Sequence, residues 1–368
     1  MKKGLATVAQ LSAFDEIIDA RSPAEFEEDR LPGAVSCPVL DDEQRAVVGT
    51  IYKQQSAFAA RRIGAAMVAE NIAHHLRTRF HDKPKGWRPL VYCWRGGQRS
   101  GSFVTWLRLI GWDACQLEGG YKSWRRMVVA ELETLPQRFD FRVVCGATGS
   151  GKTLVLEALA GLGAQVLDLE GLAAHKGSVL GALPDRPQPT QKSFETSLFD
   201  TLRAFDPARA VFVEAESRKI GRIQVPESLI QRMRASPCVT IDATRDARLE
   251  FLVRDYAYLG DDVAELQRKI DFLKGLQSNE TLARWKALAA EHDLPALFAE
   301  FIDLHYDPLY HRSQNRNFVR FPDAPAFSTD DLSPSGIAEL ARAILAACES
   351  PAAATRQSEA LSPNFSMR

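Results

Sequence analysis

The chain has 368 residues, 45% of them hydrophobic and 25% charged, and its 46 Lys and Arg balance 47 Asp and Glu to a formal net charge of −1. This composition supports buried cores in about two domains, and it lacks the bulk charge that by itself marks a nucleic-acid or membrane-surface protein. Apolar runs are too short to cross a membrane, and six scattered cysteines without a CxxC pair argue against a disulfide framework or zinc knuckle. We therefore expect a cytoplasmic protein with no membrane partner.

The first part of the chain, residues 1–138, alternates short strands with helices. Residues 16–19 form an apolar strand, and residues 22–25 have the spacing of a helix N-terminal capping box. Residues 90–93 form another apolar strand, followed by a glycine-containing loop and a helix over residues 102–110. This order predicts an α/β domain with a parallel sheet.

Positive charge is concentrated in residues 61–126, which hold thirteen Lys and Arg against four Asp and Glu, a local charge of +9. The segment is either a solvated helical surface, as most charge runs are, or an electrostatic footprint for a polyanion. On charge alone we favour the solvated surface.

The loop after the strand at residues 90–93 carries a reactive-cysteine pattern, in which Cys93 is followed by Arg95, two glycines and Arg99. Backbone N–H groups, the N-terminus of the next helix and both arginines favour a thiolate and would bind an oxyanion beside the sulfur. The alternative is a buried structural cysteine, which is how we interpret the other five cysteines. Because two arginines and two glycines lie so close together, we predict Cys93, Arg95 and Arg99 as catalytic residues.

The second part of the chain, residues 139–350, also alternates strands and helices. Its apolar strands are predicted at residues 141–145, 166–169, 210–213 and 239–241, and their separation by helical stretches indicates a parallel α/β sheet. Residues 245–277 and 282–305 form a mostly helical C-terminal part. Residues 351–368 are polar and rich in alanine and serine, and we predict a disordered tail there.

A phosphate-binding loop follows the first of these strands. Residues 146–153 match G-x-x-x-x-G-K-[ST], with the preceding strand and following helix that the motif requires. Glycines let successive backbone N–H groups face phosphate oxygens, Lys152 adds a positive charge, and Thr153 can reach a magnesium ion. The predicted phosphate-binding residues are Gly146, Gly149, Ser150, Gly151, Lys152 and Thr153. The motif does not say which phosphate compound binds.

Two pairs of carboxylates follow later strands: Asp168 with Glu170, and Glu214 with Glu216. P-loop folds usually keep an acid at such positions to orient a metal ion or a water molecule. Each acid could equally cap a following helix. The sequence does not favour either interpretation. Mg²⁺ is the metal that such a site would take, and we expect no tightly bound cofactor.

Residues 1–138 resemble a rhodanese-like domain through the strings at residues 17–21 and 31–34 and through the Cys93 loop. Rhodaneses carry sulfur or selenium on the loop cysteine, usually with four residues before the arginine, whereas five residues separate Cys93 from Arg99. Five is the spacing of the related cysteine phosphatases, which normally have His before the cysteine, where this chain has Tyr92. The larger loop would suit an oxyanion bulkier than sulfur alone.

A rhodanese-like domain followed directly by a P-loop domain resembles one family, the tRNA 2-selenouridine synthases. Short sequence motifs in both parts of the chain support this resemblance; they lie at residues 48–55, 93–100, 118–122, 145–153, 168–175, 216–221 and 306–310. The resemblance implies a rhodanese-like domain over residues 1–138 and a P-loop NTPase-like α/β domain over residues 139–350. The presence of both motifs in this order is highly specific.

The resemblance implies a selenotransferase that converts wobble 2-thiouridine in tRNA to 2-selenouridine. Members are thought to S-geranylate the base with geranyl diphosphate and then displace the geranylated sulfur using selenophosphate. Cys93 would then carry selenium, and Arg95 and Arg99 would bind selenophosphate. The P-loop would hold either the prenyl diphosphate or a nucleotide.

The resemblance also changes the interpretation of the +9 segment. A wobble base can be splayed into a pocket while phosphate contacts hold the stem, so a footprint for the anticodon arm becomes the better hypothesis. The candidate tRNA-binding residues are Arg61, Arg62, Lys122, Arg125 and Arg126. Residues 51–67 are candidates for a tRNA or geranyl contact, with a plain surface helix as the alternative. A transient contact with a selenophosphate-producing enzyme is also implied.

Two other functions stay open. The five-residue spacing suggests a cysteine phosphatase fused to a kinase-like P-loop module, although Tyr92 in place of His argues against it. The chain could also be a non-catalytic nucleotide-sensing scaffold that binds RNA, although the intact P-loop together with Cys93 argues against that.

Overall fold

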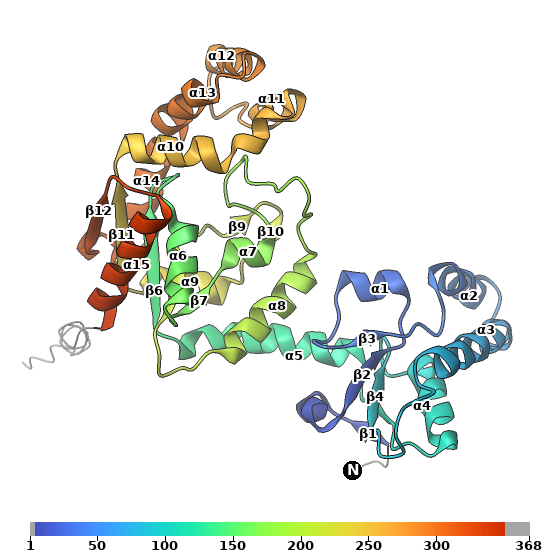
Figure 1. Ribbon diagram of the computed structural model, residues 1–368. Helices are drawn as coiled ribbons and strands as arrows, with labels where there is room; N and C mark the ends of the chain where they lie inside the picture. Colours follow the sequence, from blue (N-terminus) through green and yellow to red (C-terminus); the bar gives the residue numbers. More distant parts are fainter. Residues whose placement is uncertain (1–3, 350–368) are drawn as a thin grey trace, which may run out of the picture. The chain divides into compact units, whose positions relative to one another are not determined.

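The computed structural model describes residues 4–349 and divides into two compact units (Figure 1). The first unit runs up to Glu133 and also includes Pro189–Asp200, which we call the return segment; the second comprises Thr134–Gln188 and the residues from Thr201 onward. Each unit is built on a five-stranded parallel sheet with helices, which confirms the predicted α/β fold class. The tail predicted over residues 351–368 lies outside the described residues.

The first unit's sheet has the strand order β1-β5-β4-β2-β3, with every pair parallel. Its strands are Leu5–Ala6 (β1), Glu16–Asp19 (β2), Val35–Ser36 (β3), Pro89–Tyr92 (β4) and Cys115–Leu117 (β5). All four residues of the central strand β4 are buried, as expected for a parallel strand covered on both faces. Because the strands are parallel, the residues that follow β2 and β4 meet at the same edge of the sheet.

The α-helices of this unit before the return segment are Pro23–Glu28 (α1), Asp42–Gln54 (α2), Ala57–Thr78 (α3), Gln98–Ile110 (α4) and Tyr121–Thr134 (α5). Helix α1 begins as predicted, with Pro23 in its first turn and the Ser22 amide donating to the Glu25 carboxylate at 3.2 Å. Helices α2 and α3 form a hairpin between β3 and β4. Side chains of α3 and α4, including Ile72 and Phe103, complete the apolar core.

The return segment contributes to the first unit through helix α8, Gln191–Ala204. Thr196 Oγ1 donates a hydrogen bond to Asp29 Oδ2 at 3.1 Å, and the Phe199 ring meets the Trp124 ring edge-on at a centroid distance of 5.7 Å. Phe199 and Trp124 are both buried. The first ten residues of α8 therefore complete the core of a unit that is otherwise built from the N-terminal part of the chain.

The second unit's parallel sheet has the order β12-β11-β6-β8-β7. Its strands are Phe141–Gly146 (β6), Gln165–Leu167 (β7), Val211–Glu214 (β8), Cys238–Ala243 (β11) and Ala326–Thr329 (β12), and a small antiparallel pair is formed by Lys219–Ile220 (β9) and Ile223–Gln224 (β10). Four of the five parallel strands lie where the sequence predicts strands. The edge strand β12 was not predicted.

The remaining helices are Lys152–Gly161 (α6), Leu169–Ala173 (α7), Glu227–Ala235 (α9), Arg245–Asp255 (α10), Val263–Asp271 (α11), Asn279–Ala290 (α12), Leu294–Phe301 (α13), Asp307–Asn317 (α14) and Pro334–Glu349 (α15). A π-helix, Ile302–Tyr306, joins α13 to α14. Helices α10 to α13 pack around a second core that includes Trp285, Phe298 and Phe301. Within residues 4–349, no helix combines the length and the apolar character needed to cross a membrane.

Candidate functional site

The Cys93 loop connects β4 to α4 at the carboxyl edge of the first sheet. Cys93 is 3% exposed, and its Sγ accepts hydrogen bonds from the Gly97 amide at 3.3 Å and from Ser100 Oγ at 3.0 Å. Gly97 is the N-cap of α4, so the sulfur also lies at the positive end of a helix. Both groups donate to the sulfur, as donors around a reactive cysteine do. The sequence did not single out Ser100 as a partner of the sulfur.

Backbone contacts from the start of α5 hold the Cys93 loop in place. The amide of Tyr121 donates to the Cys93 carbonyl at 2.8 Å, and the amide of Lys122 donates to the Trp94 carbonyl at 3.1 Å. Gly120 has φ +61°, and a Cβ on it would lie 2.2 Å from the Cys93 carbonyl oxygen and 2.4 Å from the Gly96 nitrogen. Only glycine allows this close approach.

The two arginines of the Cys93 loop differ in their surroundings. Arg95 is exposed, whereas Arg99 makes a bidentate ion pair with Glu25, at 2.5 Å between Nη1 and Oε2 and 3.2 Å between Nη2 and Oε1. Burial acts to raise the pKa of Glu25, but its hydrogen bonds and attraction to Arg99 more than offset this and lower the pKa. The charge of Arg99 is therefore already paired with the Glu25 carboxylate. The sequence pattern did not predict Glu25 as a partner.

A buried polar network lies next to the Cys93 loop. The Tyr121 hydroxyl donates to Asp29 at 2.7 Å, and the Tyr121 ring lies 5.3 Å from the Trp94 ring and 4.1 Å from the Arg21 guanidinium. Burial raises the pKa of Asp29 despite the hydrogen bonds from Tyr121 and Thr196. Thr196 belongs to the return segment, so this part of the chain supports the residues around the sulfur.

We predict that Ser100→Ala slows the alkylation of Cys93 by iodoacetamide about tenfold at pH 7. The variant loses the hydroxyl that donates to Sγ, and a hydrogen bond to an ionised group stabilises it by roughly 1.5–3 kcal/mol. Peptide mass spectrometry measures the rate at Cys93 separately from the other cysteines. Ser102→Ala, on the same helix, is the control and should leave the rate unchanged. Equal rates for wild type and Ser100→Ala would show that this hydrogen bond does not activate the sulfur.

The predicted tRNA-binding cations lie on two helices. Arg61 and Arg62 are exposed on α3, and Lys122 and Arg126 are exposed on α5. Arg125 is half-buried and forms an ion pair with Glu195 of the return segment. Of the five, Arg125 is therefore the one whose charge is already matched by a carboxylate.

The predicted phosphate loop connects β6 to α6 in the second unit. Gly149 and Gly151 have φ +83° and +74°, and a Cβ on Gly149 would lie 2.8 Å from the Leu252 side chain. Lys152 Nζ donates to the Gly146 carbonyl at 2.9 Å. These features match a loop whose backbone wraps around a phosphate.

Arg248 of helix α10 supports the phosphate loop from outside the motif. It is 6% exposed, donates to the Thr148 carbonyl at 2.9 Å and makes a bidentate ion pair with Asp307. The sequence did not predict Arg248 as a site residue because it lies 100 residues from Thr148. Because Asp307 neutralises the Arg248 charge, Arg248 acts on the loop through its hydrogen bond to the Thr148 carbonyl.

Three of the four predicted carboxylates come together beside the phosphate loop. Oxygens of Glu170, Glu214 and Glu216 lie within 4.8 Å of one another, and Thr153 Oγ1 lies 3.3 Å from Glu170. Burial and repulsion from Glu216 raise the pKa of Glu170 to about 8. Burial and the neighbouring acids likewise raise the pKa of Glu214. Asp168 instead caps α7, where its Oδ1 accepts from the Gly171 amide at 2.7 Å.

A divalent cation fits this group of three glutamates. Glu214 is 1% exposed, and its Oε1 has no hydrogen-bond partner within the described part of the chain. Like charges this close are stabilised by protons or by a cation, and carboxylate oxygens with a threonine hydroxyl are ligands that Mg²⁺ accepts. We call Glu170, Glu214 and Glu216 the glutamate trio.

The phosphate loop and the glutamate trio open onto a cavity of about 570 Å³. Apolar and aromatic residues also line this cavity, together with polar ones such as Lys176 and Asp255; the apolar and aromatic residues are Phe251, Leu252, Tyr256, Tyr306, Leu309 and Tyr310. Tyr306 comes from the π-helix, a rare geometry that is frequent at functional sites. Gln314, 6% exposed, also lines the cavity, and its Oε1 has no hydrogen-bond partner among residues 4–349. The cavity thus joins a phosphate site to an apolar one.

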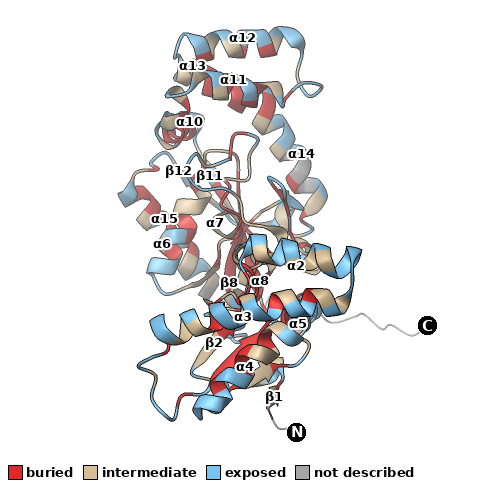
Figure 2. Ribbon diagram, turned by 90° about the vertical axis from the view of Figure 1, so that its right-hand side faces the viewer, coloured by how far each residue is buried: buried red, intermediate tan, exposed pale blue. Residues whose placement is uncertain are grey.

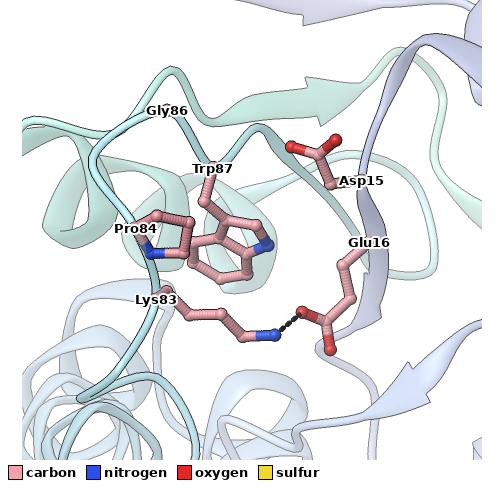
Figure 3. A pocket seen from close by; sticks show the side chains of 6 residues that line it. All are labelled: Asp15, Glu16, Lys83, Pro84, Gly86 and Trp87. Atoms are coloured by element: carbon pink, nitrogen blue, oxygen red, sulfur yellow. Dashed lines mark ion pairs between the residues drawn. The ribbon is translucent and has the colours of Figure 1, made fainter.

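A different hollow, of about 520 Å³, lies at the opposite edge of the first sheet (Figure 3). It is lined by residues that precede or begin β2 and β4, namely Asp15, Glu16, Lys83, Pro84, Gly86 and Trp87. Lys83 Nζ pairs with Glu16 Oε2 at 2.7 Å there. Because Cys93 follows β4, this hollow is not part of the reactive loop.

Two known families match the chain, one in each of these two parts. Residues 5–127, which contain the Cys93 loop, match a family described as "Rhodanese-like domain". Residues 139–284, which contain the phosphate loop and the glutamate trio, match a family described as "tRNA 2-selenouridine synthase AAA domain".

Three proteins named tRNA 2-selenouridine synthase are similar to this chain. The one from Nitrosomonas europaea is 36% identical over 259 residues, which cover 68% of this chain and 66% of that protein, just under two thirds of its length. The one from Alcanivorax borkumensis is 32% identical over 80% of this chain and 88% of that protein. The one from a Sulfurovum species is 30% identical over 83% of this chain and 90% of that protein.

Proposed function

Because this chain belongs to the tRNA 2-selenouridine synthase family, we propose that it replaces the 2-sulfur of a wobble 2-thiouridine in tRNA with selenium. The observation that carries the proposal is the combination, in one chain, of a cysteine whose sulfur accepts two hydrogen bonds and a phosphate loop that lines a cavity with apolar and aromatic side chains. The partner is the anticodon arm of tRNA, together with transient contact to an enzyme that produces selenophosphate.

The phosphate-loop cavity binds geranyl diphosphate in this proposal. The diphosphate would lie against Lys152 and the loop amides, and the ten-carbon chain against the aromatic wall. The 2-sulfur of the uridine attacks C1 of the prenyl group, the C1–O bond breaks, and diphosphate leaves. A nucleotide would also satisfy the phosphate loop, but the apolar wall that includes Leu309 and Tyr306 favours the prenyl chain.

The glutamate trio and Thr153 would hold Mg²⁺ in this proposal. When bound, the ion neutralises charge on the diphosphate leaving group. The residues of the chain supply the remaining contacts: Lys152 binds diphosphate oxygens, and Arg248 keeps the loop in position through the Thr148 carbonyl.

We predict that binding of Mn²⁺, used as a probe for Mg²⁺, strengthens as the pH rises towards 8. Without metal, burial and Glu216 raise the pKa of Glu170 to about 8, so near neutral pH it holds a proton that the ion must displace. Below that pKa, each pH unit should strengthen binding about tenfold per proton released. Isothermal titration with MnCl₂ at pH 6 to 9 measures this.

Glu170→Gln should weaken Mn²⁺ binding and flatten its pH dependence. The control is Glu157→Gln, because Glu157 lines the same cavity outside the glutamate trio. Affinity for Mn²⁺ that does not change with pH in the wild type would contradict the metal site.

The Cys93 loop binds selenophosphate in this proposal, and the Cys93 thiolate is the nucleophile that brings the base next to the selenium. Loop amides and Arg95 contact the oxyanion, and Arg99 adds its charge while Glu25 keeps it in place. The Cys93 thiolate bonds to C2 of the base, the bond from C2 to the geranylated sulfur breaks, and geranylthiol leaves. The selenium of selenophosphate then bonds to C2, and the bond from C2 to the Cys93 sulfur breaks. With water, selenophosphate yields phosphate, so the overall reaction needs no oxidant or reductant.

Nucleoside mass spectrometry tests the proposal. The protein is incubated with tRNA that carries 2-thiouridine, geranyl diphosphate and selenophosphate, and digested samples are taken over time. We expect S-geranyl-2-thiouridine to appear first and 2-selenouridine to replace it, with neither formed when geranyl diphosphate is left out. If neither nucleoside forms and a simple phosphomonoester is hydrolysed instead, the phosphatase suggested by the five-residue loop spacing is the better function.

A further inference from the structure

The hairpin of α2 and α3 presents an exposed surface that the two reaction sites do not use. No residue of α2 is buried, and Figure 2 shows the helix in the colours of exposed and intermediate residues. Near the turn between the helices, the Tyr52 side chain is 62% exposed and that of Phe58 is 69% exposed. Two exposed aromatic rings six residues apart present flat apolar faces that a binding partner can contact.

Positive charge surrounds these two rings. Residues 44–69 contain four Lys and Arg and no Asp or Glu. Within residues 4–349, no ion pair involves Lys53, Arg61 or Arg62, whereas Arg99 and Arg125 of the same unit are paired with carboxylates. Lys53, Arg61 and Arg62 therefore give the hairpin three cations that no carboxylate neutralises within the described residues.

The helical geometry brings the aromatic and basic side chains together. Arg61 and Arg62 follow Phe58 by three and four residues, so they share one face of α3. Ser56 caps α3 directly after α2 ends, which keeps Tyr52 and Phe58 at the same turn. The helices can pack closely because Gly64 has no side chain; a Cβ there would lie 3.3 Å from Val48.

We propose that Tyr52, Lys53, Phe58, Arg61 and Arg62, the hairpin surface, bind single-stranded RNA of the tRNA substrate. The two rings stack on unpaired bases, and the three cations contact the backbone phosphates on either side. Aromatic platforms bordered by cations and free of acids are the chemistry that recognises single-stranded nucleic acid. This inference rests on the proposed function and adds the surface by which the anticodon loop is held.

The experiment measures RNA binding by the full chain with fluorescence anisotropy. Two RNA probes are used: a 17-nucleotide anticodon stem-loop and a duplex of its stem without the loop. Tyr52→Ala combined with Phe58→Ala should weaken binding of the stem-loop at least tenfold and leave duplex binding nearly unchanged. Arg61→Ala combined with Arg62→Ala should weaken both, and should lower the slope of log K against log salt by about 0.7–0.9 for each phosphate that the protein no longer neutralises.

Matched variants separate stacking from effects on folding. Tyr52→Phe keeps the ring and should keep the affinity. Leu109→Ala removes another apolar side chain, 74% exposed on α4, and should have no effect. Arg77→Ala removes an exposed cation near the other end of α3 and should have a smaller effect than the removal of Arg61 and Arg62.

The outcomes distinguish this inference from the proposed function. If the wild type binds the stem-loop and the Tyr52/Phe58 variant binds it equally well, the hairpin inference is wrong and the proposed function stands. If that variant instead changes sedimentation from dimer to monomer with RNA affinity intact, the surface joins two copies of the chain and the inference is again overturned. If the wild type binds neither the stem-loop nor whole tRNA, the proposed function fails as well.

Discussion

Replacing Cys93 with serine should abolish the formation of 2-selenouridine, with a loss of about 1,000-fold or more. A serine hydroxyl stays protonated at neutral pH and is a far weaker nucleophile than a thiolate, while its size preserves the contacts from Gly97 and Ser100. Because the phosphate-loop residues are unchanged, S-geranyl-2-thiouridine should accumulate. Time-resolved nucleoside mass spectrometry measures both products.

Two controls make the result on Cys93 specific. Cys115→Ser alters a partly buried cysteine of the same unit and should retain selenium transfer. Filter binding should show that Cys93→Ser still binds tRNA. Full 2-selenouridine formation by Cys93→Ser would exclude this residue as the nucleophile of selenium transfer.

Lys152→Ala should lower the kcat/KM of S-geranylation about 10- to 100-fold. The variant removes a positive charge from the phosphate loop, and a hydrogen bond to an ionised group is worth roughly 1.5–3 kcal/mol. Initial rates with geranyl diphosphate in limiting amount measure the loss. Lys152→Arg should restore only part of the rate, because a guanidinium does not replace a compact ammonium in a tight loop.

The selenium-transfer step shows whether Lys152→Ala affects geranylation alone or the whole protein. When tRNA that already carries S-geranyl-2-thiouridine is supplied, the variant should transfer selenium at the wild-type rate. Lys274→Ala, an exposed lysine paired with Asp271, serves as the control for removal of a charge. Unchanged geranylation by Lys152→Ala would mean that the phosphate loop binds another compound, such as a nucleotide.

The strands that carry the sites were predictable because they are short apolar runs that end in polar or glycine-rich loops, whereas Leu5–Ala6 and Cys115–Leu117 of the first sheet were not predicted. The strands expected at residues 90–93 and 141–145 are Pro89–Tyr92 and Phe141–Gly146 in the structure. The strand Ala326–Thr329 was missed because it lies at the edge of its sheet and alternates exposed with half-buried residues, which leaves little apolar signal.

The candidate site was predictable where its residues are neighbours in the sequence and not where folding brings them together. The Cys93 loop and the phosphate loop are local patterns, and Gly96, Gly149 and Gly151 have the left-handed conformations that such loops need. Charge counting treated Arg99 and Arg125 as free cations, but the structure pairs them with Glu25 and Glu195, more than 60 residues away in the chain. The aromatic wall of the cavity likewise comes from helices that follow the phosphate loop at a distance of about 100 residues or more.

The first unit cannot complete its core during translation until the return segment has been synthesised. The first unit contains the N-terminus, yet the Thr196–Asp29 hydrogen bond and the packing of Phe199 on Trp124 require residues made much later. At about 5–20 residues per second, synthesis from Glu133 to Asp200 takes roughly 3–13 s. During that interval Phe199 does not yet exist to pack on Trp124, so the N-terminal unit can complete its core only after residues 134–188 of the second unit have been synthesised.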